Sequence, residues 1–194
     1  MKYLSPALVL TAALMLQTQA AHATPITFMG DLSGANEVPP VSSPGTGVVT
    51  VILDPASQTL EEKVTFSGLT TPDSMAHIHC CAPLGTNVGV ATAIPALPGF
   101  PLGVTSGSFD QTFSLTNAAF YNPAFVTLNG GTVAGAEATL VAGIEAERAY
   151  FNIHTPTNPG GEIRSQLFQV PEPASLILLG SALFGLGLMR RRRR

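Results

Sequence analysis

The chain has 194 residues, enough for one folded domain with additional segments at its ends. Charged residues make up only 11% of it, while 19 glycines and 16 prolines favour frequent turns and an all-β architecture. Between Thr24 and Val170, three basic residues stand against eleven acidic ones, a net charge of −8, so this part of the chain would repel the phosphates of a nucleic acid.

Residues 1–23 have the pattern of a secretory signal peptide. Lys2 precedes an apolar run at residues 4–16, and Ala21 and Ala23 place small side chains at the two positions that a signal peptidase reads. We expect a hydrophobic helix here, removed after Ala23. Because the run is too short to cross a bilayer as a permanent anchor, the rest of the chain is expected outside the cytoplasm.

Residues 24–170 have the pattern of one domain made of short strands and turns. Alternating apolar and polar side chains, or runs of Val and Ile, predict strands at residues 26–32, 46–53, 60–66, 75–80, 109–115, 149–155 and 162–168. A helical turn capped by Asn117 and an Ala-rich helix at residues 133–144 interrupt this series. The pattern predicts an antiparallel Greek-key β-sandwich, immunoglobulin-like or superoxide-dismutase-like, with one or two short helices.

Two of the predicted strands carry the three histidines that follow the signal peptide. Because side chains alternate along a strand, His77 and His79 point the same way, and His154 shares a face with Tyr150 and Asn152. The His-x-His pair could chelate one transition metal. His154 would complete a three-nitrogen site with an open position, which suits zinc or copper. The alternative is structural: each ring could bond a backbone carbonyl and hold a loop in place.

Further side chains could join such a site. Glu37 and Glu162 are candidate carboxylate ligands, although their spacing does not single them out. Cys80 and Cys81 follow the His-x-His pair directly and leave three interpretations open: free buried thiols, a disulfide between neighbours, or a soft ligand that would favour copper. Arg164 is expected on an exposed face, in a salt bridge worth less than about 1 kcal/mol.

The last residues combine Pro171-Glu172-Pro173, an apolar run at residues 174–189 and five arginines beginning at Arg190. Sixteen apolar residues barely span a bilayer, so a short transmembrane helix is predicted, with its basic end in the cytoplasm. The pattern resembles the PEP-CTERM sorting signal of Gram-negative bacteria. The resemblance implies an inner-membrane precursor, recognition by an exosortase, removal of the tail, and delivery to the cell surface or outside the cell, often together with exopolysaccharide.

Five motifs follow one another between residues 26 and 167. They are Leu32-Ser33-Gly34-Ala35-Asn36-Glu37-Val38-Pro39-Pro40, Phe66-Ser67-Gly68-Leu69, Ala76-His77-Ile78-His79, Tyr150-Phe151-Asn152-Ile153-His154-Thr155 and Asn158-Pro159-Gly160-Gly161-Glu162-Ile163-Arg164. Their order and spacing resemble the CHRD domain, first named for chordin and also found in secreted bacterial proteins. The chain departs from that pattern at Cys80-Cys81, where small residues and glycine are more usual, and at Ser165, where glycine is usual. The family has no settled biochemical role, so the resemblance leaves the activity open.

Two functions are compatible with these patterns. The first is an exported, non-enzymatic structural or binding module at the cell surface or in the extracellular matrix, with exopolysaccharide or matrix proteins as partners. The alternative is a copper or zinc module, or a copper redox module, that uses His77, His79 and His154. Copper-zinc superoxide dismutases have a similar His-x-His strand in a β-sandwich, but the chain lacks their bridging histidine and acidic zinc ligands.

Overall fold

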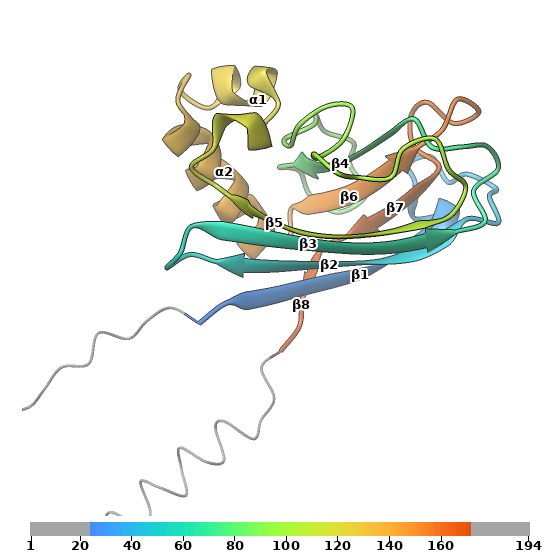
Figure 1. Cartoon of the computed structure of the whole chain (residues 1–194), viewed down its shortest axis with the longest axis horizontal. Coiled ribbons are helices and arrows are strands. Elements are labelled where there is room, and N and C mark those ends of the chain that lie inside the picture. The colour runs from blue at the N-terminus through green and yellow to red at the C-terminus, as the bar shows by residue number, and fades with distance from the viewer. Residues whose placement is uncertain (1–23, 172–194) are drawn as a thin grey trace, which may run out of the picture.

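The computed structural model describes residues 24–171, which form a curled antiparallel sheet with two short helices at one end (Figure 1). The strands are β1 (Ile26–Ser33), β2 (Thr46–Asp54), β3 (Thr59–Ser67), β4 (Met75–Cys80), β5 (Gly107–Ser114), β6 (Ala149–His154), β7 (Ile163–Gln166) and β8 (Phe168–Gln169). The helices are α1 (Pro123–Leu128) and α2 (Val133–Glu145), and 3₁₀ turns lie at Gly34–Asn36 and Ala118–Phe120. The prediction of an antiparallel β architecture with short helices is confirmed.

Several predicted features lie outside the described residues. They are the signal peptide, the sorting residues Glu172, Pro173 and Arg190, and the hydrophobic helices expected at the two ends. Within residues 24–171, no helix has the length and apolar character needed to cross a membrane. The two ends of this segment lie side by side, because Val170 N donates a hydrogen bond to Thr27 O next to the pairing of β8 with β1.

The sheet is continuous, and the prediction of two separate packed sheets is wrong. Its strand order is β4-β6-β7-β1-β2-β3-β5, with β8 also paired to β1. The two halves are joined by β1, which pairs with β2 along its whole length. The other edge of β1 pairs with β7, where Ser33 lies opposite Arg164, and with β8. Alternation along the sequence predicts strands, but it does not reveal that β1 forms hydrogen bonds with strands of both halves.

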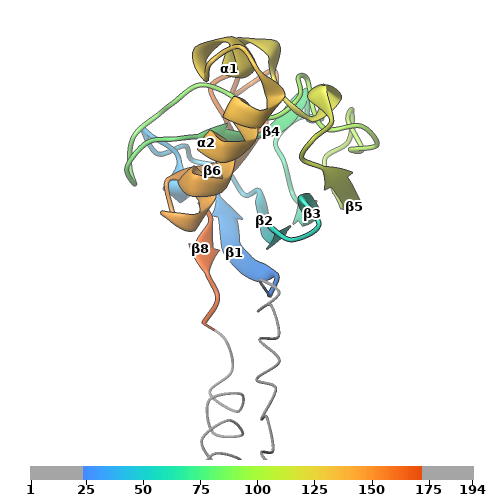
Figure 2. The same cartoon turned by 90° about the vertical axis from the view of Figure 1, so that its left-hand side faces the viewer.

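The sheet curls around an apolar core that α2 covers at one end (Figure 2). Both halves contribute fully buried side chains, including Phe28, Leu53, Leu60, Ile78, Phe151, Ile153 and Ile163, and α2 adds Leu140 and Ile144. The predicted helix starts where Thr132 Oγ1 accepts a hydrogen bond from Gly135 N, an N-cap contact. Because Ile78 of β4 and Phe151 and Ile153 of β6 face the core, the alternate residues of these strands face the other way.

Candidate metal centre

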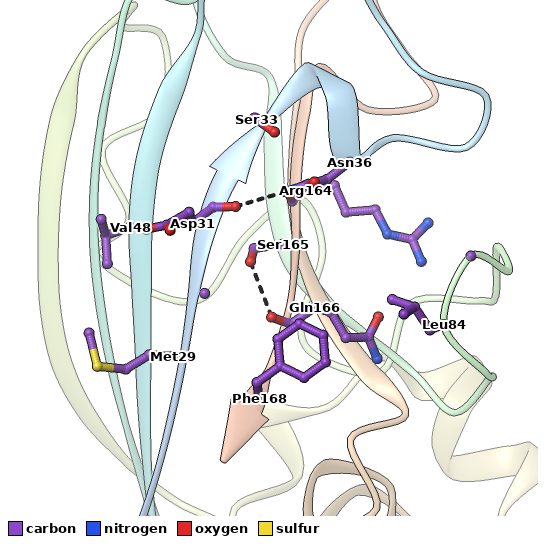
Figure 3. Close-up of a pocket in the computed structure, with 12 residues that line it drawn as sticks. Met29, Asp31, Ser33, Asn36, Val48, Leu84, Arg164, Ser165, Gln166 and Phe168 are labelled. Atoms are coloured by element: carbon purple, nitrogen blue, oxygen red, sulfur yellow. Dashed lines mark hydrogen bonds between the residues drawn. The ribbon is translucent and has the colours of Figure 1, made fainter. Parts of the chain in front are cut away.

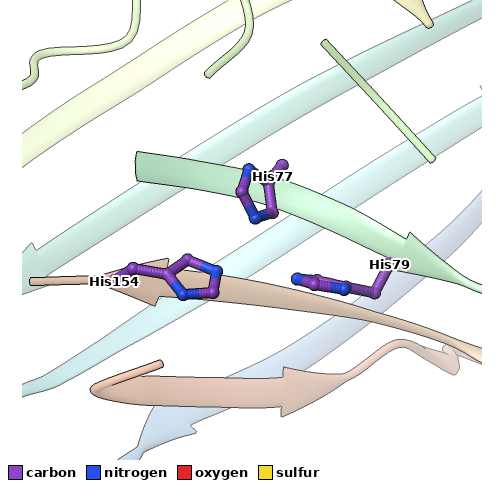
Figure 4. A group of neighbouring side chains, drawn as sticks. All are labelled: His77, His79 and His154. Atoms are coloured by element: carbon purple, nitrogen blue, oxygen red, sulfur yellow. The ribbon is translucent and has the colours of Figure 1, made fainter. Parts of the chain in front are cut away.

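The pairing of β4 with β6 brings the three histidines together. In the antiparallel register, His77 lies opposite Asn152. His154 lies opposite Met75, near the start of β4, and His79 lies opposite Tyr150, near the end of β4. The ring centroid of His77 lies 4.8 Å from that of His79 and 4.7 Å from that of His154. Figure 4 shows the three rings turned toward a common space. The three rings, which the sequence assigns to two strands far apart in the chain, therefore lie next to one another in the structure.

Each ring is held through its Nδ1 atom by a backbone carbonyl from a surrounding loop. His77 Nδ1 lies 3.3 Å from Pro95 O, His79 Nδ1 lies 2.7 Å from Val88 O, and His154 Nδ1 lies 3.0 Å from Pro159 O. Because a carbonyl only accepts hydrogen bonds, each Nδ1 carries the proton. In a neutral ring, this leaves the Nε2 atom with its lone pair free.

The histidines are buried, with exposed fractions of 2% for His77, 8% for His79 and 5% for His154. Burial lowers the pKa of His77 to about 3, assisted by the neighbouring rings of His154 and His79 and opposed by the bond to Pro95. Burial also lowers the pKa of His79 to about 4 and lowers the pKa of His154. The site at neutral pH is therefore three uncharged imidazoles.

The second nitrogen of each ring has no partner. The Nε2 atoms of His77, His79 and His154 are buried and make no hydrogen bond to any described residue. A buried polar atom left unpaired costs about 1–3 kcal/mol. Structural hydrogen bonding, the alternative interpretation of the sequence, accounts for the three Nδ1 atoms but not for three unpaired Nε2 atoms in one place.

The spacing of the histidines fits a small cation. One ligand nitrogen from each ring lies within 4.8 Å of the others. Tetrahedral zinc with Zn–N bonds of about 2.0–2.1 Å requires nitrogens about 3.4 Å apart. Inward shifts of about 1 Å at the ring ends, within reach of small χ rotations, would close the site. With three protein ligands, one coordination position stays open for another molecule.

The two candidate carboxylates lie outside this group of ligands. Glu37 Oε1 accepts a hydrogen bond of 2.7 Å from Asn152 Nδ2, and burial raises the pKa of Glu37 to about 7. Glu162 accepts hydrogen bonds from Ser43, Thr70 and Thr155 through both carboxylate oxygens. Burial alone would raise the pKa of Glu162, but these hydrogen bonds outweigh it and lower the pKa. Through these hydrogen bonds, Glu162 links the three chain segments that contain Ser43, Thr70 and Thr155.

The cysteines form a disulfide with each other, which is one of the three interpretations that the sequence leaves open. Cys80 follows His79 on β4, so its side chain points to the opposite side of the strand. Both sulfurs pack against α2 at Gly143, where a side chain would collide with them. Neither sulfur is therefore a thiolate, so the interpretation of a soft cysteine ligand beside the histidines does not apply to the disulfide form.

Arg164 is buried rather than exposed, contrary to the prediction from its strand position. Its guanidinium lies 3.4 Å from the centre of the Tyr150 ring and donates hydrogen bonds to Asn87 Oδ1 and Thr86 O. The other face of the Tyr150 ring stacks on His79, with centroids 4.5 Å apart. The phenol and His79 Nδ1 also share the carbonyl of Val88. Tyr150 therefore fixes the orientation of one candidate ligand, a role the sequence alone did not reveal.

A second concave surface lies where β1 meets β7 and β8. This groove has a volume of about 780 Å³, and Arg164 and Gln166 of β7 line it (Figure 3). Its rim carries exposed apolar side chains, which are Met29, Val48, Leu84 and Phe168. None of the three histidines lines this groove, but its lining residue Arg164 contacts the Tyr150 ring that stacks on His79.

Two comparisons with known families agree with this organisation. The family model of the CHRD domain matches residues 28–167, a segment that contains both helices, all three histidines and most of the strand residues. The model of the PEP-CTERM protein-sorting motif matches residues 169–194. That motif marks an exported protein with a membrane-anchored precursor, processing by an exosortase and delivery to the cell surface or the extracellular space. No curated protein and no solved structure matches the chain.

Proposed function

The chain belongs to the CHRD domain family, and we propose that its domain is an exported binding module that holds one copper or zinc ion through His77, His79 and His154. The observation that carries this proposal is the set of three unpartnered, buried Nε2 atoms in one place. A single cation accepts all three lone pairs at once, and imidazole is a good ligand for both metals.

The loops around the site supply the second layer of contacts that metal-binding histidines require. In metal sites, the ring nitrogen that does not bind the metal almost always donates to a carbonyl, a carboxylate or water. The carbonyls of Val88, Pro95 and Pro159 have this position here. The tautomers are therefore fixed before any metal arrives, which lowers the entropic cost of binding.

The processing of the chain follows from its two ends. In this proposal, residues 1–23 are removed by signal peptidase, residues 24–170 form the binding domain, and residues 171–194 anchor the precursor through a short transmembrane helix with an arginine tail. The domain then reaches the cell surface or matrix with its metal. A structural role beside exopolysaccharide or matrix proteins is compatible with this location, and the apolar rim of the groove at β1 and β7 favours contact with a partner.

Metal analysis tests the proposal. We expect the full chain, purified in detergent, stripped with chelator and then incubated with Zn²⁺ or Cu²⁺, to retain one metal ion after gel filtration. The metal should also raise the thermal unfolding temperature, because a ligand that binds only the folded state stabilises it. A chain that retains no metal and shows no change in unfolding temperature would contradict the proposed function.

A further inference from the structure

Asn152 lies beside two of the three candidate ligands. It is opposite His77 in the pairing of β4 with β6, and it precedes His154 by two residues on the same face of β6. Directly paired side chains of an antiparallel sheet have Cβ atoms about 4.5–5.5 Å apart, and residues i and i+2 share a face. Asn152 is only 1% exposed, so its amide belongs to the same buried polar layer as the histidines.

The two ends of this amide have different surroundings. Asn152 Nδ2 donates a hydrogen bond of 2.7 Å to Glu37 Oε1. Because a carboxylate oxygen accepts hydrogen bonds, this contact assigns the NH₂ end of the amide to Glu37. Asn152 Oδ1, at the other end, is buried and accepts no hydrogen bond from any described residue. The free end of the amide is therefore an acceptor.

On the paired strands β4 and β6, three Nε2 atoms and one amide oxygen thus have no donor among the described residues. A metal ion bound by the three rings satisfies the nitrogens but gives the amide oxygen no hydrogen. A water molecule in the open coordination position would do so, because its oxygen binds the metal and its hydrogens remain available to an acceptor. Such a water would complete both the coordination of the metal and the hydrogen bonding of the amide.

We propose that Asn152 Oδ1 accepts a hydrogen bond from a water molecule that fills the fourth coordination position of the metal. This inference rests on the proposed function and adds to it a positioning residue and a ligand preference. The fourth position is exchangeable, and it selects ligands that can donate a hydrogen bond. An anion without hydrogens, such as thiocyanate, displaces the water only by leaving Asn152 Oδ1 unpaired.

The test is the affinity of thiocyanate for the Co²⁺-loaded full chain, followed by the visible absorption of the metal. Asn152→Leu removes the acceptor, so thiocyanate should bind it about tenfold or more tighter than it binds the wild-type chain, as expected from the cost of an unpaired buried acceptor. Gln166→Leu is the matched control. Gln166 also has a buried, unpartnered amide oxygen, but it lies on β7 and should leave the thiocyanate affinity unchanged.

The outcomes separate this inference from the function on which it rests. A wild-type chain that binds no Co²⁺ contradicts the metal site itself and removes the inference with it. A chain that binds Co²⁺ but has the same thiocyanate affinity with Asn152 or Leu at this position overturns only the role of Asn152. A second measurement needs no variant: pulsed EPR of the Cu²⁺-loaded wild-type chain in D₂O should detect exchangeable deuterons of a bound water. Their absence would also overturn the inference.

Discussion

Replacement of His77 by alanine is expected to lower the affinity of the chain for Zn²⁺ and Cu²⁺ by more than about 100-fold, because even groups that only support a metal ligand contribute about 10–100-fold. His77 occupies the centre of the cluster, with its ring within 4.8 Å of both other rings. Without it, His79 and His154 remain as two ligands with ring centroids 5.8 Å apart. Competition with a chromophoric chelator measures the change in affinity.

The control for this prediction is Met75→Leu. Met75 lies on β4 two residues before His77 and opposite His154, so the variant changes the neighbourhood of the site but no imidazole. We expect its metal affinity to stay within a few fold of the wild-type value. If His77→Ala and Met75→Leu bound metal equally well, the three-histidine site would be contradicted.

Acid is expected to destabilise the metal-free chain through the same histidines. Their folded-state pKa values of about 3 for His77 and about 4 for His79 lie below the ordinary value of 6.5. At a pH between the folded-state pKa values and 6.5, the unfolded chain therefore binds more protons than the folded chain. The contribution of the histidines to stability is complete above pH 6.5 and is lost as the pH falls toward 3. At 1.36 kcal/mol per pKa unit, the loss is on the order of 5 kcal/mol or more.

Urea unfolding at pH 7, 5 and 4 measures this loss, and His77→Gln is the comparison that isolates it. Burial raises the pKa of Glu62 to about 8, so this carboxyl acts in the opposite direction and stabilises the fold as the pH falls toward 4.5. Both chains contain Glu62, so the difference between them reports His77. We expect the wild-type chain to lose several kcal/mol more than His77→Gln between pH 7 and pH 4. Equal losses would show that His77 is not held neutral by burial.

The sequence predicts the parts of this site that depend on strand alternation. His77 and His79 share a face because they are two residues apart, and the same rule placed Tyr150, Asn152 and His154 together. Alternation also correctly assigned Ile78 and Phe151 to the core. The predicted capping role of Asn117 is local as well, since its side chain accepts a hydrogen bond from Ala119 N, two positions further on.

The features that the sequence did not predict depend on contacts between distant segments. Arg164 alternates like an exposed residue, but Thr86 and Asn87 reach across from a loop to cover it. The three carbonyls that fix the imidazole tautomers belong to loops whose path no periodicity describes. The same holds for the single curled sheet, because the pairing of β1 with β7 and β8 joins residues more than a hundred positions apart.

X-ray absorption at the metal edge of the zinc- or copper-loaded chain is the most direct test of the three-histidine site. We expect a first shell with three imidazole nitrogens at about 2.0–2.1 Å and one further light atom from the exchangeable ligand. The multiple-scattering signal of imidazole rings would count the histidines. A first shell made of oxygen atoms alone, or one containing a single imidazole, would contradict the three-histidine site.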